Sequence, residues 1–277
     1  MDKPLSMRIH LCQTDIHWES PSKNFASVAE LLESVSLEAG DLIVLPEMYA
    51  TGFSMNTGAT AEPADGPGFQ FLRKLATDTG CAVLGGLTTI SESDASPASS
   101  RPRNQAVFLT PEGQEVSRYD KTYPFSLGGE DQVFEAGNGM EVFEWGGIRW
   151  ASAICYDLRF PELFRSGVDL GAECFLVIAN WPEKRVDHWT TLIKARAIEN
   201  QAICVGVNRT GSDPFHQYCG HSLACDPLGL ALVEITSKES VLSFTPDMDG
   251  LRTWREKFPA LDDRSRHQKA TKAGEKL

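Results

Sequence analysis

The sequence of 277 residues predicts one α/β domain, and three observations support this fold class. Short apolar runs alternate along the chain with segments of helical spacing. One of these runs, Leu42–Leu45, lacks the polar alternation of a half-exposed strand, which is typical of a strand covered on both faces. No long linker, repeat or change of composition divides the chain. The pattern is consistent with two sheets between helical layers, and it also allows a single doubly wound sheet.

The first third of the chain alternates between strand and helix signals. Strands are expected at 7–12, 41–45 and 81–90, and helices at 24–36 and 68–79. The helix at 24–36 is indicated by Val28, Leu31, Leu32 and Val35, which fall on one stripe. Pro46 ends the second strand because it has no N–H group to donate. The segment 91–103 is rich in Ser, Pro and Asp and is expected to be an exposed loop.

The remainder carries three hairpin signals, each a turn sequence between two apolar runs. The paired runs are 105–110 with 114–119, 140–145 with 148–154, and 222–225 with 230–235. Further strands are expected at 174–179, 203–207 and 241–244, and helices at 160–166, 185–200 and 247–257. One domain therefore spans 1–261. The polar tail, 262–277, is expected to fray or to reach over a neighbour.

Composition and charge disfavour several classes of function. With 26 Lys and Arg against 38 Asp and Glu, the net charge of −12 argues against nucleic acid as a partner. The sequence contains no run of about 18 apolar residues, so it predicts no membrane-spanning helix. Residues 1–10 lack the apolar segment of a secretory signal, and the seven cysteines include no C-x-x-C pair. We therefore expect a cytoplasmic location, no membrane partner and reduced thiols.

Three segments place a reactive side chain at the end of a predicted strand. Glu47 follows an apolar strand directly after Pro46, and Lys121 lies within a run of aromatic residues. Cys155 lies where an apolar strand stops and a helix begins, so the helix dipole is expected to favour its thiolate. Each residue alone also fits an ordinary position: a solvated glutamate, a surface lysine or a packed cysteine.

Together, the three segments resemble the carbon–nitrogen hydrolase (nitrilase) superfamily. The motifs are Leu45-Pro46-Glu47, Asp120-Lys121-Thr122-Tyr123-Pro124-Phe125 and Cys155-Tyr156-Asp157-Leu158-Arg159-Phe160-Pro161-Glu162, in that order. The resemblance covers roughly residues 7–259. It implies a four-layer α-β-β-α sandwich, a catalytic triad of Glu47, Lys121 and Cys155, and a homodimer or larger assembly. Glu130 matches a second functional glutamate of the family.

The sequence is most similar to the ω-amidase branch, which acts on monoamides of 2-oxo dicarboxylic acids. The segment 47–55 carries this similarity, together with Asn180-Trp181-Pro182 followed by Arg185, His188 and Trp189. These last three residues also fit the surface of an ordinary amphipathic helix.

The chemistry of amide hydrolysis accounts for the triad independently. It needs a nucleophile, a proton shuttle and a group that stabilises the oxyanion. Cys155 would attack, and Glu47 would carry its proton to the departing ammonia and then activate water. Lys121 and the backbone N–H of Tyr156 would stabilise the oxyanion. The mechanism calls for no cofactor and no metal.

The substrate carboxylate of a 2-oxo acid monoamide requires a local cation, because a buried anion without a partner is costly. Arg185 is the first candidate, since it opens a helix just beyond a strand end. Arg159 is the second, although an ion pair with Asp157 or Glu162 is an equal alternative. Trp181 and Phe53 are expected to form apolar walls. Tyr156, whose backbone N–H faces the oxyanion, is also expected to bind the substrate.

Other functions remain possible interpretations of the sequence. N-carbamoyl-amine hydrolysis, nitrile hydrolysis and amide transfer to another acceptor would use the same triad. A different class, a metal-stabilised binding module, is suggested by four metal-binding side chains within ten residues: His216, Cys219, His221 and Cys225. Their spacing fits no standard zinc motif.

Overall fold

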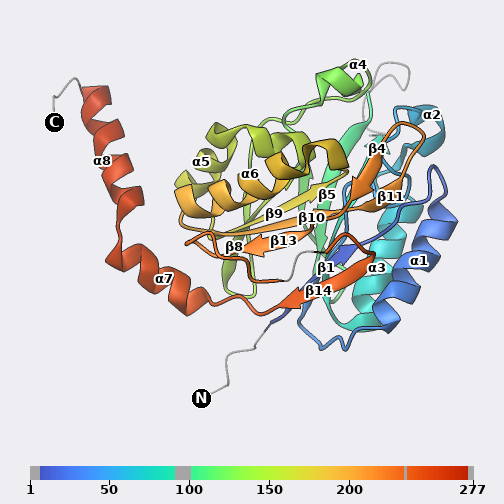
Figure 1. Cartoon of the computed structure of the whole chain (residues 1–277), viewed down its shortest axis with the longest axis horizontal. Helices are drawn as coiled ribbons and strands as arrows, with labels where there is room; N and C mark the ends of the chain where they lie inside the picture. The colour runs from blue at the N-terminus through green and yellow to red at the C-terminus, as the bar shows by residue number, and fades with distance from the viewer. Residues whose placement is uncertain (1–6, 91–100, 234–235, 274–277) are drawn as a thin grey trace.

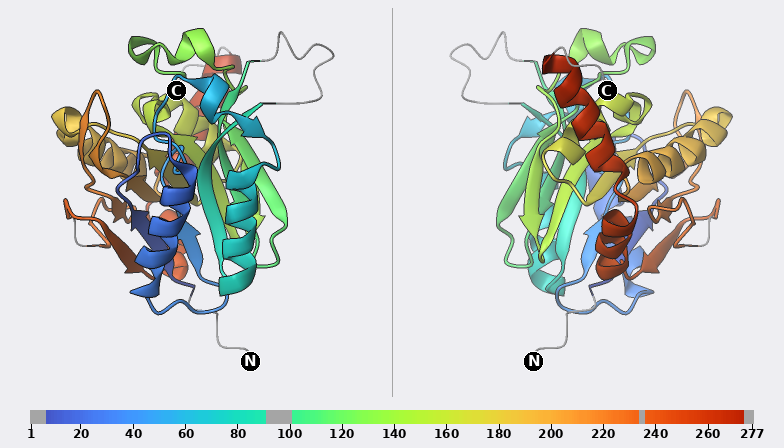
Figure 2. Two further views of the ribbon diagram at one scale, coloured as in Figure 1. Left: turned by 90° about the vertical axis from the view of Figure 1, so that its right-hand side faces the viewer. Right: turned by 90° about the vertical axis from the view of Figure 1, so that its left-hand side faces the viewer.

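The computed structural model describes residues 7–90, 101–233 and 236–273. In this part of the chain two β-sheets pack face to face, and helices cover both outer faces (Figures 1 and 2).

The first sheet has seven strands. In spatial order they are β14 (Ser240–Phe244), β1 (Ile9–Gln13), β2 (Leu42–Val44), β4 (Ala82–Ile90), β5 (Arg103–Leu109) and β6 (Glu115–Asp120), and β3 (Glu62–Pro63) pairs with β4. The central strands β1, β2 and β4 run parallel, so that Leu11 lies opposite Val44 and Val44 opposite Leu84. Helices α1 (Pro21–Glu33) and α3 (Pro67–Thr79) cover the outer face of this sheet.

The second sheet has five strands. In spatial order they are β13 (Leu223–Cys225), β10 (Ile203–Asn208), β9 (Cys174–Ala179), β8 (Ile148–Ile154) and β7 (Val142–Trp145). The strands β8, β9 and β10 run parallel, and α5 (Pro161–Asp169) and α6 (Val186–Glu199) cover their outer face. A short antiparallel pair, β11 (Thr210–Ser212) and β12 (Gln217–Cys219), lies apart from both sheets.

Apolar side chains from both sheets fill the space between them. Fully buried members are Leu11, Val44, Leu84 and Phe108 from the first sheet and Trp150, Leu176 and Val205 from the second. Separate apolar clusters join each sheet to its own helices. The four-layer α-β-β-α sandwich that the resemblance implied is therefore confirmed, and the alternative of a single doubly wound sheet is wrong.

The third predicted hairpin forms only in part. Residues 230–233 make one isolated bridge, between Cys225 and Ala231, in place of a strand. The Asp226 side chain accepts the N–H groups of Leu228 and Leu230, and a bond of this kind competes with a strand ladder. Residues 234–235 of this hairpin, and residues 91–100 of the predicted loop, lie outside the described residues.

Some elements were not predicted because they are too short to show a period. They are α2 (Thr57–Thr60), η1 (Ser126–Gly128), α4 (Glu130–Val133), η2 (Cys155–Arg159) and η3 (Glu183–Arg185), together with β3, β11 and β12.

The C-terminal region differs from the predicted polar tail. After α7 (Met248–Lys257), the chain forms a further helix, α8 (Ala260–Ala273), which stands beside the layers of the sandwich (Figure 1). The Arg264 guanidinium makes two hydrogen bonds, of 2.6 and 2.9 Å, to the Asp169 carboxylate at the end of α5. The predicted homo-oligomer stays a prediction. Among the helices of the described ranges, none is both long and apolar enough to cross a membrane.

Candidate active site

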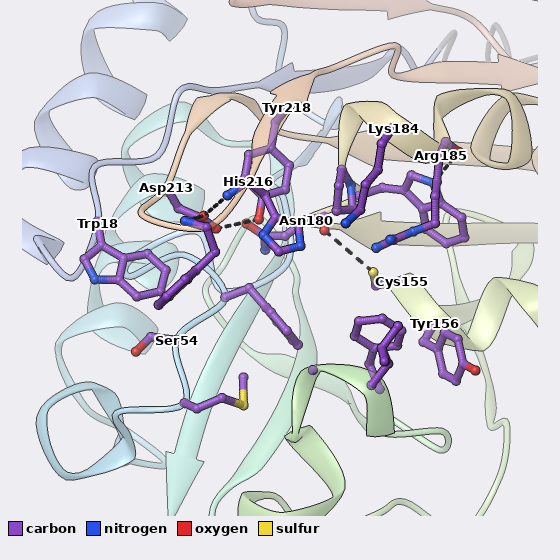
Figure 3. Close-up of a pocket in the computed structure, with 18 of the residues that line it drawn as sticks. Trp18, Ser54, Cys155, Tyr156, Asn180, Lys184, Arg185, Asp213, His216 and Tyr218 are labelled. Atoms are coloured by element: carbon purple, nitrogen blue, oxygen red, sulfur yellow. Dashed lines mark hydrogen bonds between the residues drawn. The ribbon is translucent and has the colours of Figure 1, made fainter.

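Four polar side chains lie where strands end. Glu47 follows β2, Lys121 follows β6, Cys155 follows β8 and Asn180 follows β9. Because the two sheets pack face to face, these ends come together at one edge of the sandwich, where ligand crevices open in α/β folds. Figure 3 shows the Cys155 thiol directed at the Asn180 backbone carbonyl, with 4.0 Å between sulfur and oxygen.

The backbone around Glu47 holds a fully buried carboxylate in place. The next residue, Met48, has a φ of 45°, which is uncommon for a residue other than glycine. The neighbouring strand β4 approaches this turn closely at Gly86. A Cβ atom at Gly86 would lie 2.6 Å from the Glu47 Cα and 2.5 Å from the Met48 nitrogen, so this position requires glycine.

Lys121 lies between two buried carboxylates. Its Nζ is 2.9 Å from Glu47 Oε1 and 2.8 Å from Glu130 Oε2, so the structure places the predicted second glutamate within the same cluster. Burial alone would lower the pKa of Lys121, but Glu130 and Glu47 outweigh it and raise the pKa above its ordinary value. Lys121 is therefore a fixed cation, and its ammonium lies 5.2 Å from the centre of the Phe53 ring.

Two asparagines that sequence analysis did not assign to the chemistry complete this cluster. Asn104 Nδ2 donates to Glu47 Oε1 at 2.7 Å and to Glu130 Oε1 at 2.9 Å. Asn180 donates its backbone N–H to Glu47 Oε2 at 2.8 Å and its side-chain amide to the Glu47 backbone oxygen at 2.6 Å. Asn180 belongs to a motif quoted above. Asn104 lies at the start of β5 in a polar run, and only the packing of the sheets reveals its burial.

Cys155 occupies a strained turn between β8 and η2. Its φ is 47°, which turns the chain sharply at the strand end. Burial, and then the charge of Glu47, raise the pKa of the thiol well above its ordinary value. The expectation of a stabilised thiolate is therefore wrong for the free site. Only a short 3-10 helix starts at Cys155, and burial together with the neighbouring glutamates outweighs the favourable charge of Lys121.

A cavity of about 660 Å³ opens over Cys155 (Figure 3). All five predicted substrate-binding residues line it: Phe53, Tyr156, Arg159, Trp181 and Arg185. Sequence analysis missed other lining residues, among them Trp18, Met55, Phe125, Lys184, Phe215 and Tyr218. They come from separate parts of the sequence, and only the fold brings them together around one cavity.

Three cations, Arg159, Lys184 and Arg185, give one wall of the cavity a positive charge. The Arg185 guanidinium lies 5.6 Å from the centre of the Phe125 ring, and that of Arg159 lies 4.8 Å from the Trp181 ring. Across the described ranges, no salt bridge joins any of the three cations to a carboxylate.

The alternative in which Arg159 forms an ion pair with Asp157 or Glu162 is therefore wrong. Arg159 instead donates a hydrogen bond of 3.2 Å to His188 Nδ1, and Asp157 is buried and bonded to other groups. The positive wall is left free to meet an anion from solution.

The four residues of the metal alternative do not form a ligand set. His221 is hydrogen-bonded to the Ser237 hydroxyl at 2.9 Å, and Cys225 is buried in β13. Within the part of the chain that the structure describes, no group of three or more His, Cys, Asp or Glu side chains could hold a metal ion.

Comparison with known proteins agrees with this architecture. The carbon–nitrogen hydrolase family matches residues 8–256. The ω-amidase YafV of Yersinia enterocolitica is 36% identical over 260 residues, which cover 93% of this chain and 96% of that protein. The 2-oxoglutaramate amidase of Bacillus subtilis is 34% identical over 256 residues, which cover 92% and 96%.

A solved structure shows the same fold. It is a carbon–nitrogen hydrolase superfamily protein from Xanthomonas campestris with an arsenic adduct in its active site. It matches with a TM-score of 0.84 and 34% identity over 93% of this chain and 96% of that one. The chain therefore belongs to the carbon–nitrogen hydrolase family. Within that family it is an amidase, as the sequence analysis predicted.

Proposed function

We propose that the protein hydrolyses the terminal amide of a 2-oxo dicarboxylic acid monoamide, such as 2-oxoglutaramate, to the acid and ammonia. One observation carries the proposal: Cys155 lines a cavity that is also lined by Arg185, a cation with no carboxylate partner among the described residues, and the charges of the buried Glu47–Lys121 pair act on the same thiol. The similarity to enzymes named ω-amidase and 2-oxoglutaramate amidase supports the same substrate class.

The first half-reaction forms a thioester. Because the pKa of the thiol is raised, Cys155 starts protonated, and Glu47 takes the proton as sulfur attacks the amide carbon. Lys121 and the Tyr156 N–H stabilise the negative charge that develops on the carbonyl oxygen. When the tetrahedral intermediate collapses, the C–N bond breaks and Glu47 gives its proton to the departing ammonia.

The second half-reaction releases the acid. Glu47 takes a proton from water, which attacks the thioester carbon. The C–S bond then breaks, and the proton on Glu47 returns to the sulfur, so that no net proton remains on the protein. Glu130 acts through charge, because its carboxylate holds Lys121 in position throughout.

Arg185 supplies the charge that the substrate carboxylate needs. It caps the start of α6 at the cavity wall, and its guanidinium lies near the Phe125 ring. This guanidinium has no carboxylate partner among the described residues. A guanidinium can bind a carboxylate through two parallel hydrogen bonds, which would fix the distance from the carboxylate to the amide.

The test is ammonia release from a matched panel. The panel contains 2-oxoglutaramate, 2-oxosuccinamate, glutamine, asparagine, a neutral amide of the same length, a nitrile and an N-carbamoyl amine. We expect the highest kcat/KM for a 2-oxo acid monoamide, with the Cys155→Ala protein as the blank. A higher kcat/KM for the neutral amide, the nitrile or the N-carbamoyl amine would reject the substrate class and leave the hydrolase family assignment intact.

A further inference from the structure

Asp157 is a fully buried carboxylate that binds three donors from two separate segments. Its Oδ2 accepts the Ile154 N–H at 2.9 Å and the Tyr119 hydroxyl at 2.8 Å. Its Oδ1 accepts the Tyr123 N–H at 2.8 Å. One side chain therefore joins the end of β8 to the end of β6 and the loop that follows it.

Each of these contacts lies next to a residue of the proposed triad. The Ile154 N–H comes directly before the left-handed turn at Cys155, so its bond to Asp157 braces a strained backbone. On the other side, Tyr119 and Tyr123 each lie two residues from Lys121, one before it and one after it.

We propose that Asp157 is a positioning residue, whose carboxylate holds the Cys155 turn and the Lys121 segment at the spacing that the reaction requires. The inference rests on the proposed roles of Cys155 and Lys121, but it does not depend on which amide is the substrate. Asp157 would not touch the substrate and would act only through these two residues.

The hydrogen-bond pattern specifies a carboxylate. All three partners are donors in their contact with Asp157, and only an ionised carboxyl accepts three bonds without turning a proton toward another donor. Burial raises the pKa of Asp157 to about 7, so the charged form depends on these three donors and on the nearby Lys121 ammonium. An amide of the same shape would present its NH₂ group to at least one of the donors.

The decisive variant is Asp157→Asn, with Asp41→Asn as its matched control. Asp41 is also a buried carboxylate, which accepts the Arg8 N–H at 2.8 Å and lies 2.9 Å from the His10 ring nitrogen, and it does not line the cavity. We expect Asp157→Asn to lower kcat by about 30-fold or more with KM within about threefold, because small displacements of reacting groups cost this much. Asp41→Asn should retain the wild-type kcat per folded molecule.

A second readout needs no substrate. Alkylation of Cys155 by iodoacetamide should be about fivefold slower in Asp157→Asn, because Lys121 would no longer be held where it favours the thiolate. Unchanged or faster alkylation per folded molecule would overturn the proposal, as would a loss confined to KM. Since this measurement involves no amide, a wrong substrate class and a wrong role for Asp157 give different results.

The Tyr119→Phe variant covers the case in which Asp157→Asn does not fold. It removes one of the three donors and keeps the ring. We expect kcat to fall about three- to tenfold with KM unchanged, since two of the three bonds remain. If Tyr119→Phe kept both the wild-type kcat and the wild-type alkylation rate, the proposed positioning role of Asp157 would be rejected.

Discussion

The charged cluster around Lys121 and the cation wall around Arg185 belong to one site but are built in opposite ways. In the cluster, Lys121 and its two glutamates are at most 1% exposed and meet at hydrogen-bond distances of 2.8 to 3.0 Å. On the wall, the guanidinium groups of Arg159 and Arg185 lie 4.8 and 5.6 Å from the centres of aromatic rings, and no carboxylate of the described residues pairs with them.

In the proposed function, this difference separates reaction from recognition. A buried cluster joined by several short hydrogen bonds has little freedom to reorganise, which is what electrostatic stabilisation of a transition state requires. Stacked cations at the wall can shift to meet a ligand, and they remain available to an anion. Changes in the cluster should therefore lower kcat, whereas loss of the wall cation that binds the substrate carboxylate should raise KM.

The largest expected effect follows from removing the nucleophile. Cys155→Ala should lower kcat by about 10³ or more, because no other cysteine lines the cavity among the described residues. Ammonia release on the best panel amide measures this loss, and an unchanged thermal unfolding midpoint shows that the fold is intact. Cys219→Ala serves as the control thiol. Retention of more than a few per cent of wild-type turnover by Cys155→Ala would contradict the assignment.

The next largest effect concerns the coupling within the cluster. Glu47→Gln and Lys121→Met should each lower kcat by about 10²–10⁴, because each removes a group used in the same step. The double variant should lose little more than the worse single one, since the residues act as a unit. Lys121→Arg should not rescue, because a planar guanidinium does not fit between two carboxylates that hold an ammonium. Multiplicative losses in the double variant would show independent roles.

A smaller effect, confined to recognition, is expected at the wall. Arg185→Ala should raise KM for 2-oxoglutaramate about tenfold or more, which is the usual scale for a lost charged hydrogen bond. The neutral amide of equal length should be affected far less. Arg159→Ala is the matched control, because Arg159 is a second cation in the same cavity, and its KM should stay within about threefold. If KM rises about tenfold in Arg159→Ala and stays within about threefold in Arg185→Ala, Arg159 rather than Arg185 binds the carboxylate.

The smallest expected effect is a shift in a pH profile. Thiolate is the form that iodoacetamide attacks, and the pKa of Cys155 is raised by burial and by Glu47. Labelling of the Cys155 peptide, followed by mass spectrometry, should therefore still be rising at about pH 9, above the ordinary pKa of cysteine. Glu47→Gln removes a negative charge and should move this rise to lower pH. A plateau below about pH 8 in the wild type would contradict the raised pKa.

The sequence predicted the parts of the site that lie in short motifs at strand ends. Glu47, Lys121 and Cys155 could be found because each comes directly or almost directly after a strand and has recognisable neighbours. Asn104 could not be found, because its contacts with Glu47 and Glu130 exist only once β4 and β5 pair within the sheet. The pKa of Cys155 was predicted in the wrong direction for the same reason, since burial is a property of the whole fold.

The fold shows the same division. The long strands and the helices α1, α3, α5, α6 and α7 were all expected from the sequence, within a few residues of their observed bounds. The helix α8 was missed because its sequence is polar and has no apolar stripe, so its residues looked like a tail. Its contact with Asp169 depends on where α5 ends in space.

Gly86 limits how this enzyme could diversify. Because Gly86 has no side chain, β4 packs closely against the backbone of Glu47, so no other amino acid fits there without moving the proposed proton shuttle. The backbone of Glu47 therefore has little room to move, so its position cannot change to suit substrates of a new shape. Adaptation to other amides would instead be easier at the cavity lining, where Phe53 and Arg185 are only partly buried and do not hold the Glu47 backbone.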